Sequence, residues 1–403
     1  MTDKIRLGFI PLSDASPLVL AKEMGLFADE GLDVELRKER SWALIRDKVA
    51  YGELDGAHML APMVVASAFG LAPIPTSFAT GFAFNLNGNG ITVSNRLYEE
   101  ISRLRPFEPG RPPTAEGLRM VASERFRAGK PPLTLAMVYP FSAHNYLLRY
   151  WLADAGLHPD RDVRLIVVPP PEMVRACEAG EIDGYCVGEP WNTVAVDRGV
   201  GRQILFGRDI WSAAPEKVLG VRRDWLDEHH DTHQALLRAL LKAVQLLKTS
   251  DGQRAAAELL ALPEYVAQPA ELILPSLSGN AVQPTSGERI AVPDYTVYDA
   301  GTASFPWLSK AAWLAVQMVR WGQLKSAGDV LTTLRPAFRT DLFRLAANAL
   351  NIAVPDQDIQ VEGGTETNRL LDRSVFHSAS PMIYLEQFAR HSVREPLDEV
   401  FSA

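Results

Sequence analysis

The chain has 403 residues, of which 47% are hydrophobic and 22% are charged, and its formal net charge is −8. This composition is ordinary for a globular protein that is large enough to bury one large core or two to three smaller ones. Because no long run of lysine or arginine offsets the negative charge, the composition argues against nonspecific binding to nucleic acid. A small anion is still a suitable ligand, since a local site can be positive on an acidic protein.

The N-terminus begins with a short apolar stretch that predicts a strand over residues 5–10. This stretch ends at Pro11 and is far shorter than the apolar segment of a secretion signal. No stretch of the chain approaches the ~20 apolar residues that a membrane-spanning helix needs. We therefore expect a cytoplasmic protein without a membrane partner. Cys177 and Cys186 are expected to be buried thiols in a reducing compartment, and a disulfide across the Gly180 turn is the alternative.

Predicted strands and helices alternate in the first part of the chain. Strands are predicted over residues 5–10 and 32–36, with a helix over residues 18–25 between them. The asparagine and glycine cluster at residues 85–90 predicts a tight turn before a strand, because these residue types tolerate positive φ angles.

Two similar stretches, residues 41–62 and residues 171–190, organise the chain. Each is predicted to form a helix, a glycine stop and a strand closed by proline, and the motif Gly-Glu-(Leu/Ile)-Asp-Gly occurs in both. Ser41 is a good N-cap for the first helix, and Pro171 is a good first residue for the second. The repetition predicts two similar α/β lobes in place of one large sheet.

A Pro-rich stretch over residues 104–132 is predicted to be a linker into the second lobe. A strand over residues 133–138 follows, then a loop and cap over residues 142–145 and a helix over residues 146–155. The predicted domain limits are residues 1–114 for the first part of lobe I, residues 115–220 for lobe II, and residues 221–403 for the return to lobe I and a C-terminal helical extension.

The cleft between the two predicted lobes is the expected ligand site. In open α/β sheets, ligands bind at the carboxyl ends of the parallel strands, where loops and helix N-termini present N–H groups. The loops predicted to reach this cleft contribute Trp42, Asn89, His144 and Lys217. An indole, an amide, an imidazole and an ammonium group together suit a small oxyanion.

Each of these four residues also has a purely structural interpretation. Trp42 can be a packing residue at the start of a helix, and Asn89 a turn residue. His144 can cap a helix, and Lys217 can be a solvated surface lysine. Only their convergence on one cleft favours a binding role.

Catalysis has little support in the sequence. The chain lacks the Gly-x-Ser-x-Gly elbow, the phosphate loop that ends in Gly-Lys-Ser/Thr, the His-Glu-x-x-His zinc pair and the dinucleotide fingerprint. We therefore expect a binding protein and no enzyme, with no metal and no cofactor.

Recognisable motifs occur in order along nearly the whole chain, at residues 41–48 (SWALIRDK), 55–63 (DGAHMLAPM), 86–91 (LNGNGI), 144–152 (HNYLLRYWL), 168–171 (VPPP), 187–192 (VGEPWN), 215–217 (PEK) and 317–322 (QMVRWG). Together they resemble the nitrate/bicarbonate-binding proteins of ABC transporters. The resemblance implies an α/β type II periplasmic-binding-protein fold, with two Rossmann-like lobes and a ligand cleft between them.

The resemblance also implies how the ligand is held. In the nitrate-binding members, the residues that hold the planar anion fall here on Trp42, His144 and Lys217, and the backbone contributes near Pro170 and Gly188. These assignments come from the resemblance and predict a site formed by both lobes.

Two exchanges bear on the choice of ligand. A glutamine donor of the transport proteins falls on Asn89 here, which shortens the donor arm. The bicarbonate-binding relatives carry an acid where Lys217 stands, and they use calcium. A lysine at this position favours nitrate or nitrite, because a cation beside a monoanion needs no bridging metal.

A transport receptor needs a signal peptide, and because this sequence begins close to its first strand, we expect a protein that is not exported. In this it resembles a cytosolic nitrate/nitrite sensor whose partner is an RNA-binding antiterminator response regulator of nitrate assimilation. The resemblance implies that the ligand-free sensor sequesters the antiterminator and that nitrate or nitrite releases it, without direct contact to nucleic acid. The alternatives are a substrate-binding protein of a nitrate or bicarbonate ABC transporter and an enzyme of the pyrimidine-synthase type.

Overall fold

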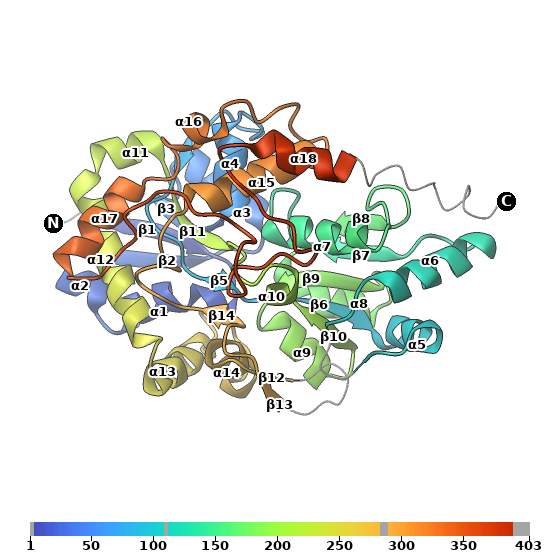
Figure 1. Ribbon diagram of the computed structural model, residues 1–403. Helices are drawn as coiled ribbons and strands as arrows, with labels where there is room; N and C mark the ends of the chain where they lie inside the picture. The colour runs from blue at the N-terminus through green and yellow to red at the C-terminus, as the bar shows by residue number, and fades with distance from the viewer. Residues whose placement is uncertain (1–3, 109–111, 283–288, 390–403) are drawn as a thin grey trace.

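The computed structural model describes residues 4–108, 112–282 and 289–389. The described chain forms two α/β lobes that lie side by side, with lobe I at the left and lobe II at the right of Figure 1. The predicted two-lobed α/β fold is therefore confirmed. The N-terminal residues 1–3 and residues 109–111 of the Pro-rich stretch lie outside the described residues.

Lobe I is built around a mixed five-stranded sheet. In spatial order its strands are β2 (Val34–Lys38), β1 (Ile5–Phe9), β3 (Gly56–Leu60), β11 (Lys217–Arg222) and β4 (Phe78–Ala79). β1 is parallel to both neighbours, whereas β11 runs antiparallel to β3 with Lys217 opposite Leu60. The helices of this lobe are α1 (Ser16–Glu23), α2 (Leu26–Asp29), α3 (Trp42–Ala50), α4 (Ala61–Ala68), α11 (Arg223–Glu228), α12 (His230–Leu246), α13 (Ser250–Leu260), α14 (Ala270–Ser278) and α17 (Thr340–Ala349).

Lobe II has a second five-stranded sheet. Its strands in spatial order are β10 (Gly201–Phe206), β6 (Asn89–Ser94), β9 (Gly184–Gly188), β7 (Thr134–Met137) and β8 (Arg164–Val167). β7 is parallel to β8 and β9, while β6 is antiparallel to β9 and β10. The helices of this lobe are α5 (Asn95–Leu104), α6 (Glu116–Arg127), α7 (Ala143–Asp154), α8 (Met173–Glu178), α9 (Trp191–Asp197) and α10 (Gly207–Ile210).

The chain changes lobes earlier than the predicted limit between residues 114 and 115. β6 already belongs to the second sheet, and β11 has returned to the first sheet by Lys217. The crossing occurs at the predicted asparagine and glycine turn, where Asn87 has a φ of 63° and Gly88 a φ of 90°. The Pro-rich stretch that was predicted to be a linker instead contains α6, a helix of lobe II.

The two repeated stretches form the helix, stop and strand that the sequence predicts. The Ser41 Oγ accepts a hydrogen bond from the Leu44 N–H at 3.3 Å and caps α3. Gly52 and Gly180 end their helical stretches with φ angles of 75° and 70°. Pro171 differs from the prediction, because it lies in a 3-10 turn over Pro170–Glu172 that precedes α8.

The start of α7 also differs from the prediction. The Ser142 Oγ accepts a hydrogen bond from the Asn145 N–H at 3.0 Å, so the helix begins at Ala143. His144, predicted in a loop, therefore lies in the first turn of α7. Because the first N–H groups of a helix carry the positive end of its dipole, this position favours a nearby negative charge.

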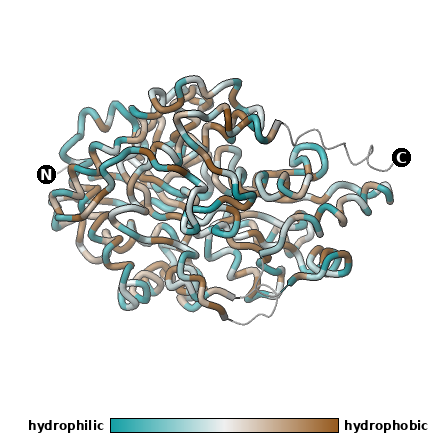
Figure 2. Tube along the Cα trace, in the orientation of Figure 1, coloured by the Kyte–Doolittle hydropathy of each residue, from teal (hydrophilic) through white to brown (hydrophobic). Residues whose placement is uncertain are grey.

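The outer helices contain both hydrophobic and hydrophilic residues along their length (Figure 2). This is typical of helices that cover a core with one apolar face. Cys177 and Cys186 are free and buried, which confirms the predicted thiols. No helix of the described ranges has both the length and the apolarity that crossing a bilayer requires.

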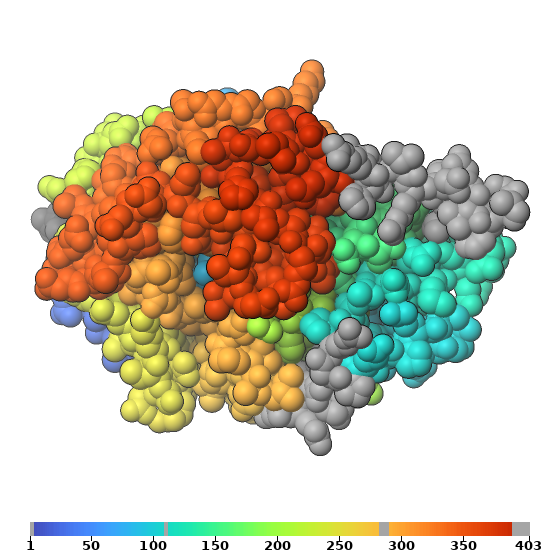
Figure 3. All heavy atoms as spheres, in the orientation of Figure 1, coloured from blue at the N-terminus to red at the C-terminus, as the bar shows by residue number. Residues whose placement is uncertain are grey.

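A C-terminal strap, residues 352–380, crosses the front of both lobes and is red in Figure 3. It reaches lobe II through the Leu371 N–H, which donates to the Ile210 carbonyl at 2.8 Å. It reaches α15 (Leu308–Arg320) through Glu362, whose Oε2 lies 3.0 Å from the Lys310 Nζ. The strap then leads into α18 (Pro381–Ala389), which packs on α15. The strap therefore ties the two lobes together.

Glu362 is the buried anchor of the strap. Its carboxylate accepts hydrogen bonds from Ser309, Lys310 and Asn368. We predict that Glu362→Ala lowers the free energy of unfolding by about 3 kcal/mol, because the Lys310 ammonium would stay buried without its carboxylate. Urea unfolding followed by tryptophan fluorescence measures this loss. Glu366→Ala, which removes an exposed carboxylate of the same strap, should leave stability nearly unchanged, and equal losses in both variants would contradict the prediction.

Candidate functional site

A buried polar cluster lies where the two lobes meet. We name it the central cluster, and its members are Asp14, Trp42, His58, Asn89, His144, Glu216 and Lys217. The most exposed of them, Asp14, has only 4% of its surface in contact with solvent. Lobe I supplies five members from the turn after β1, the start of α3, the middle of β3 and the start of β11, and lobe II supplies two from β6 and α7.

The Lys217 ammonium group joins the two carboxylates of the central cluster. The Nζ lies 2.7 Å from the Asp14 Oδ2 and 2.6 Å from the Glu216 Oε2. A methyl group at Gly188, the last residue of β9, would lie 3.4 Å from the same Nζ, so the absence of a side chain there leaves room beside the ammonium. The Lys217 ammonium therefore faces two carboxylates and, in lobe II, the backbone of Gly188.

The aromatic members of the cluster present unused hydrogen-bonding groups. The Trp42 ring packs against the His58 ring at a centroid distance of 5.8 Å, and the His58 Nε2 lies 3.1 Å from the Asp14 Oδ1. Within the described part of the chain, the Trp42 Nε1–H has no acceptor. A buried donor without a partner costs about 1–3 kcal/mol, so this indole would gain from an added acceptor.

Lobe II approaches the cluster from the other side. The Asn89 amide donates to the Glu216 Oε1, so its N–H group is engaged by a carboxylate. The His144 Nε2 lies 3.8 Å from the Glu216 Oε2, which is too long for a hydrogen bond. Among the described residues, neither His144 nitrogen has a hydrogen-bond partner. Glu216 is thus the carboxylate that both lobes share.

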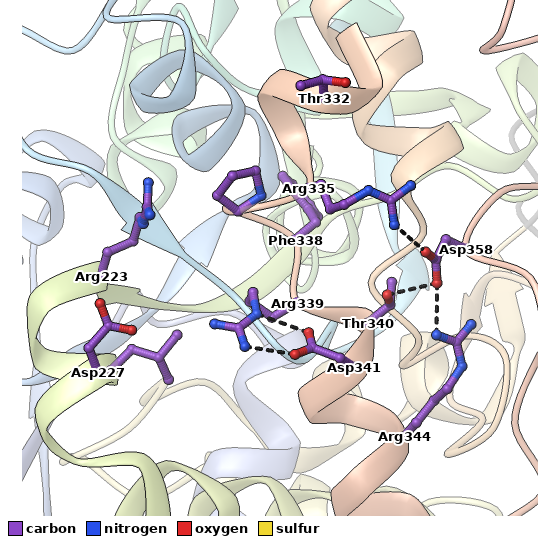
Figure 4. A pocket seen from close by; sticks show the side chains of 12 residues that line it. Arg223, Asp227, Thr332, Arg335, Phe338, Arg339, Thr340, Asp341, Arg344 and Asp358 are labelled. Atoms are coloured by element: carbon purple, nitrogen blue, oxygen red, sulfur yellow. Dashed lines mark hydrogen bonds and ion pairs between the residues drawn. The ribbon is translucent and has the colours of Figure 1, made fainter.

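A separate surface pocket of about 460 Å³ lies on lobe I between α11 and the start of α17 (Figure 4). Three of its four arginines form ion pairs: Arg339 with Asp341 at 2.7 Å, and Arg335 and Arg344 with Asp358 at 2.8 and 2.7 Å. The fourth is Arg223. The pocket lies on the surface, whereas the central cluster is buried.

The sequence of residues 2–261 matches the model of the NMT1-like family. The chain belongs to the NMT1-like family. The protein is 37% identical to the nitrate import ATP-binding protein NrtC and 36% identical to the bicarbonate transport ATP-binding protein CmpC, both of Synechocystis sp.. Each match covers 96% of this chain but only 55% of the relative, so the chain spans about half the length of these curated relatives.

A solved structure of a related protein agrees with the two-lobed fold. The crystal structure of the periplasmic nitrate-binding protein NrtA from Synechocystis PCC 6803 superposes with a TM-score of 0.84 at 32% identity. It covers 96% of this chain and 98% of the NrtA chain. The predicted resemblance to nitrate/bicarbonate-binding proteins and the periplasmic-binding-protein fold are therefore confirmed at the level of the family.

Two charges of this NMT1-like protein are fixed by their neighbours. Burial alone would raise the pKa of Asp14, but Lys217 and His58 outweigh it and hold that pKa well below its usual value. Burial alone would lower the pKa of Lys217, but Asp14 and Glu216 outweigh it and raise that pKa. The Asp14 carboxylate and the Lys217 ammonium are consequently both charged near neutral pH.

The other titratable members lose charge on burial. Burial raises the pKa of Glu216 to about 7, although Lys217 opposes the shift. Burial, and then the Lys217 charge, hold the pKa of His144 well below its usual value. Burial also lowers the pKa of His58, against the opposing effect of Asp14. Both imidazoles are therefore neutral near pH 7, and Glu216 is the group that titrates there.

The structure brings together five of the six residues that the sequence and the resemblance single out: Trp42, Asn89, His144, Gly188 and Lys217. The sixth, Pro170, is buried in the turn after β8, and in the described ranges no hydrogen bond or ion pair joins it to the cluster. Their part in binding stays a prediction.

Sequence reasoning missed the side chains of Asp14, His58 and Glu216. Glu216 directly precedes Lys217 in the sequence, and Asp14 follows the first strand. A useful signal was available, because a lysine that is placed in a buried cleft requires a carboxylate near it. The candidate counter-charges were the acids on the neighbouring loop ends.

Glu216 should control part of the pH dependence of stability. Its pKa of about 7 in the folded protein exceeds the usual glutamate value of about 4.5. Its contribution to stability is therefore complete below pH ~4.5 and is lost as the pH rises through about 7. We predict that Glu216→Gln gains about 3 kcal/mol of unfolding free energy relative to the unmodified protein between pH 5 and pH 8.

Urea unfolding at several pH values measures this difference. Glu99→Gln, which changes an exposed carboxylate of α5, is the matched control and should show no such trend. A constant difference between Glu216→Gln and the unmodified protein would show that Glu216 does not titrate in this range.

Proposed function

We propose that this chain binds nitrate or nitrite at the central cluster, as a substrate-binding protein of the kind that serves ABC transporters. The observation that carries the proposal is the buried Trp42 indole N–H, which has no acceptor among the described residues, in the same cluster as the Lys217 ammonium. Both groups can only donate hydrogen bonds, so an oxyanion is their natural ligand. The similarity to NrtA supports the same ligand class.

The donors come from both lobes. Trp42 and Lys217 belong to lobe I, while His144 in the first turn of α7 belongs to lobe II. A planar monoanion that accepts hydrogen bonds from all three would bridge the lobes. The ligand would thereby favour the arrangement in which donors of both lobes reach it, since a ligand shifts an equilibrium toward the state that it binds better.

Lys217 also bears on the choice between nitrate and bicarbonate. Its ammonium lies between the Asp14 and Glu216 carboxylates, at 2.7 and 2.6 Å, where a divalent cation would otherwise be needed to balance them. This arrangement supports a monoanion that binds without calcium. The relatives include both NrtC and CmpC, so the ligand must be decided by titration.

We predict that Lys217→Gln abolishes measurable nitrate and nitrite binding, because the ammonium is the one positive charge of the central cluster. Trp42→Phe should weaken binding by about tenfold, which corresponds to the loss of one hydrogen bond to a charged group. Isothermal titration calorimetry with nitrate, nitrite, bicarbonate with and without calcium, and sulfate measures both effects.

Lys22→Gln, which changes an exposed lysine of α1, is the control and should bind as the unmodified protein does. Undiminished nitrate affinity in Lys217→Gln, with the fold intact by circular dichroism, would contradict the site. Binding of bicarbonate only with calcium would contradict the ligand.

A second, more specific proposal is that the protein acts as a cytoplasmic sensor of nitrate or nitrite whose partner is an RNA-binding antiterminator response regulator. It is supported by the sequence resemblance alone, whereas the similarity to NrtA favours the transport receptor. The sensor also has a physical requirement, because nitrate and the antiterminator must prefer different states of the cleft.

Two measurements decide between sensor and receptor. Fractionation of cells that express the natural gene places the protein in the cytoplasm or outside it. Gel filtration with the purified antiterminator, with and without nitrate, should show a complex that nitrate dissolves. A protein that is exported and forms no complex would establish the transport receptor.

A further inference from the structure

Glu216 is the buried carboxylate of the central cluster that lies closest to groups of both lobes. It is 1% exposed, and its carboxylate lies against groups of both lobes. The Oε2 lies 2.6 Å from the Lys217 Nζ and 3.8 Å from the His144 Nε2, and the Oε1 accepts from the Asn89 amide. An anion that bridges the lobes at Lys217 and His144 would therefore sit beside this carboxylate.

The charges around Glu216 do not accommodate a further negative charge. The titratable groups that face it are Lys217 on β11, Asp14 in the turn after β1, Cys186 on β9 and His144 on α7. His58 on β3 lies behind Asp14, 3.1 Å from its Oδ1. In the described cluster, the Lys217 ammonium already balances Asp14. An anion added beside an ionised Glu216 would place three negative charges around one ammonium, out of contact with water, which is strongly unfavourable.

The two carboxylates differ in how firmly they keep their charge. Asp14 lies 2.7 Å from the Lys217 Nζ and 3.1 Å from the His58 Nε2, so it has two charge-stabilising neighbours. Glu216 has Lys217 and the neutral Asn89 amide. The pKa of Asp14 is held below its usual value while burial raises that of Glu216 to about 7, so Glu216 is the carboxylate that accepts a proton more readily.

We propose that Glu216 takes up one proton when the anion binds, so that the protein binds a monoanion together with a proton. The proton offsets the charge of the anion, and the net charge of the central cluster stays the same. The protonated carboxyl also gains an O–H group that can donate a hydrogen bond to an anion oxygen. This inference rests on the proposed function and adds a positioning residue to the site.

The proposal has a defined pH dependence. Because the pKa of Glu216 is about 7, its proton is already present at lower pH and must be taken from solution at higher pH. One proton per anion lowers the affinity about tenfold for each pH unit above about 7, and the affinity levels off below it. Nitrate itself does not titrate in this range, so the change belongs to the protein.

The test is calorimetric titration of the unmodified protein with nitrate at pH 8 in HEPES and in Tris, at equal ionic strength. The two buffers release protons with different enthalpies, so the difference in observed enthalpy gives the number of protons taken up. We expect about one proton per nitrate, and an affinity that falls about tenfold from pH 7.5 to pH 8.5. In Glu216→Gln the proton uptake and this pH dependence should both disappear, while Glu99→Gln should keep both.

Each outcome is informative. Nitrate binding without proton uptake would overturn this inference and leave the proposed function standing. Uptake that persists in Glu216→Gln and is lost in His144→Gln would assign the proton to the imidazole and also overturn it. No nitrate binding at any pH would overturn the proposed function and this inference together. If Glu216→Gln does not fold, the pH dependence of the unmodified protein still decides whether a proton is taken up.

Discussion

The burial of one ammonium group at the junction of two lobes is the constraint on which the central cluster depends. Lys217 has 0% of its surface exposed, and a buried charge of this kind needs opposite charges close to it. Asp14 and Glu216 supply them at 2.7 and 2.6 Å. This requirement fixes the turn after β1 against the start of β11. It also places Asn89 of lobe II on a carboxylate of lobe I, so the charge balance joins the two halves of the molecule.

A second buried ion pair, on the front of the molecule, also joins segments that are distant in the sequence. The Lys310 Nζ lies 3.0 Å from Glu362 and also donates to the Ala213 carbonyl at 2.7 Å. This pair anchors the C-terminal strap across both lobes, whereas the central cluster lies at their junction. The two pairs differ in their balance, because Glu362 is matched by one lysine but Lys217 faces two carboxylates. The central cluster therefore holds one carboxylate more than its single ammonium balances, and the proposed proton uptake would remove that excess charge.

Local sequence signals predicted much of the fold, and tertiary pairing accounts for the rest. The repeated helix, stop and strand were predicted because caps and positive-φ glycines act over a few residues. The lobe limit was placed too late, since the partners of β6 lie more than ninety residues further along the chain. In the site, Trp42, His144 and Lys217 were found through loops and resemblance. Asp14 and Glu216 were missed, because which acids balance a buried lysine depends on how strand ends meet in space.

The most direct test of the account is a crystal structure of the protein grown with nitrate. The account predicts a planar anion in the central cluster, within hydrogen-bond distance of the Trp42 Nε1 and the Lys217 Nζ and bordered by His144 of lobe II. A nitrate ion bound only in the surface pocket of Figure 4, or a central cluster that holds no anion at saturating nitrate, would contradict it.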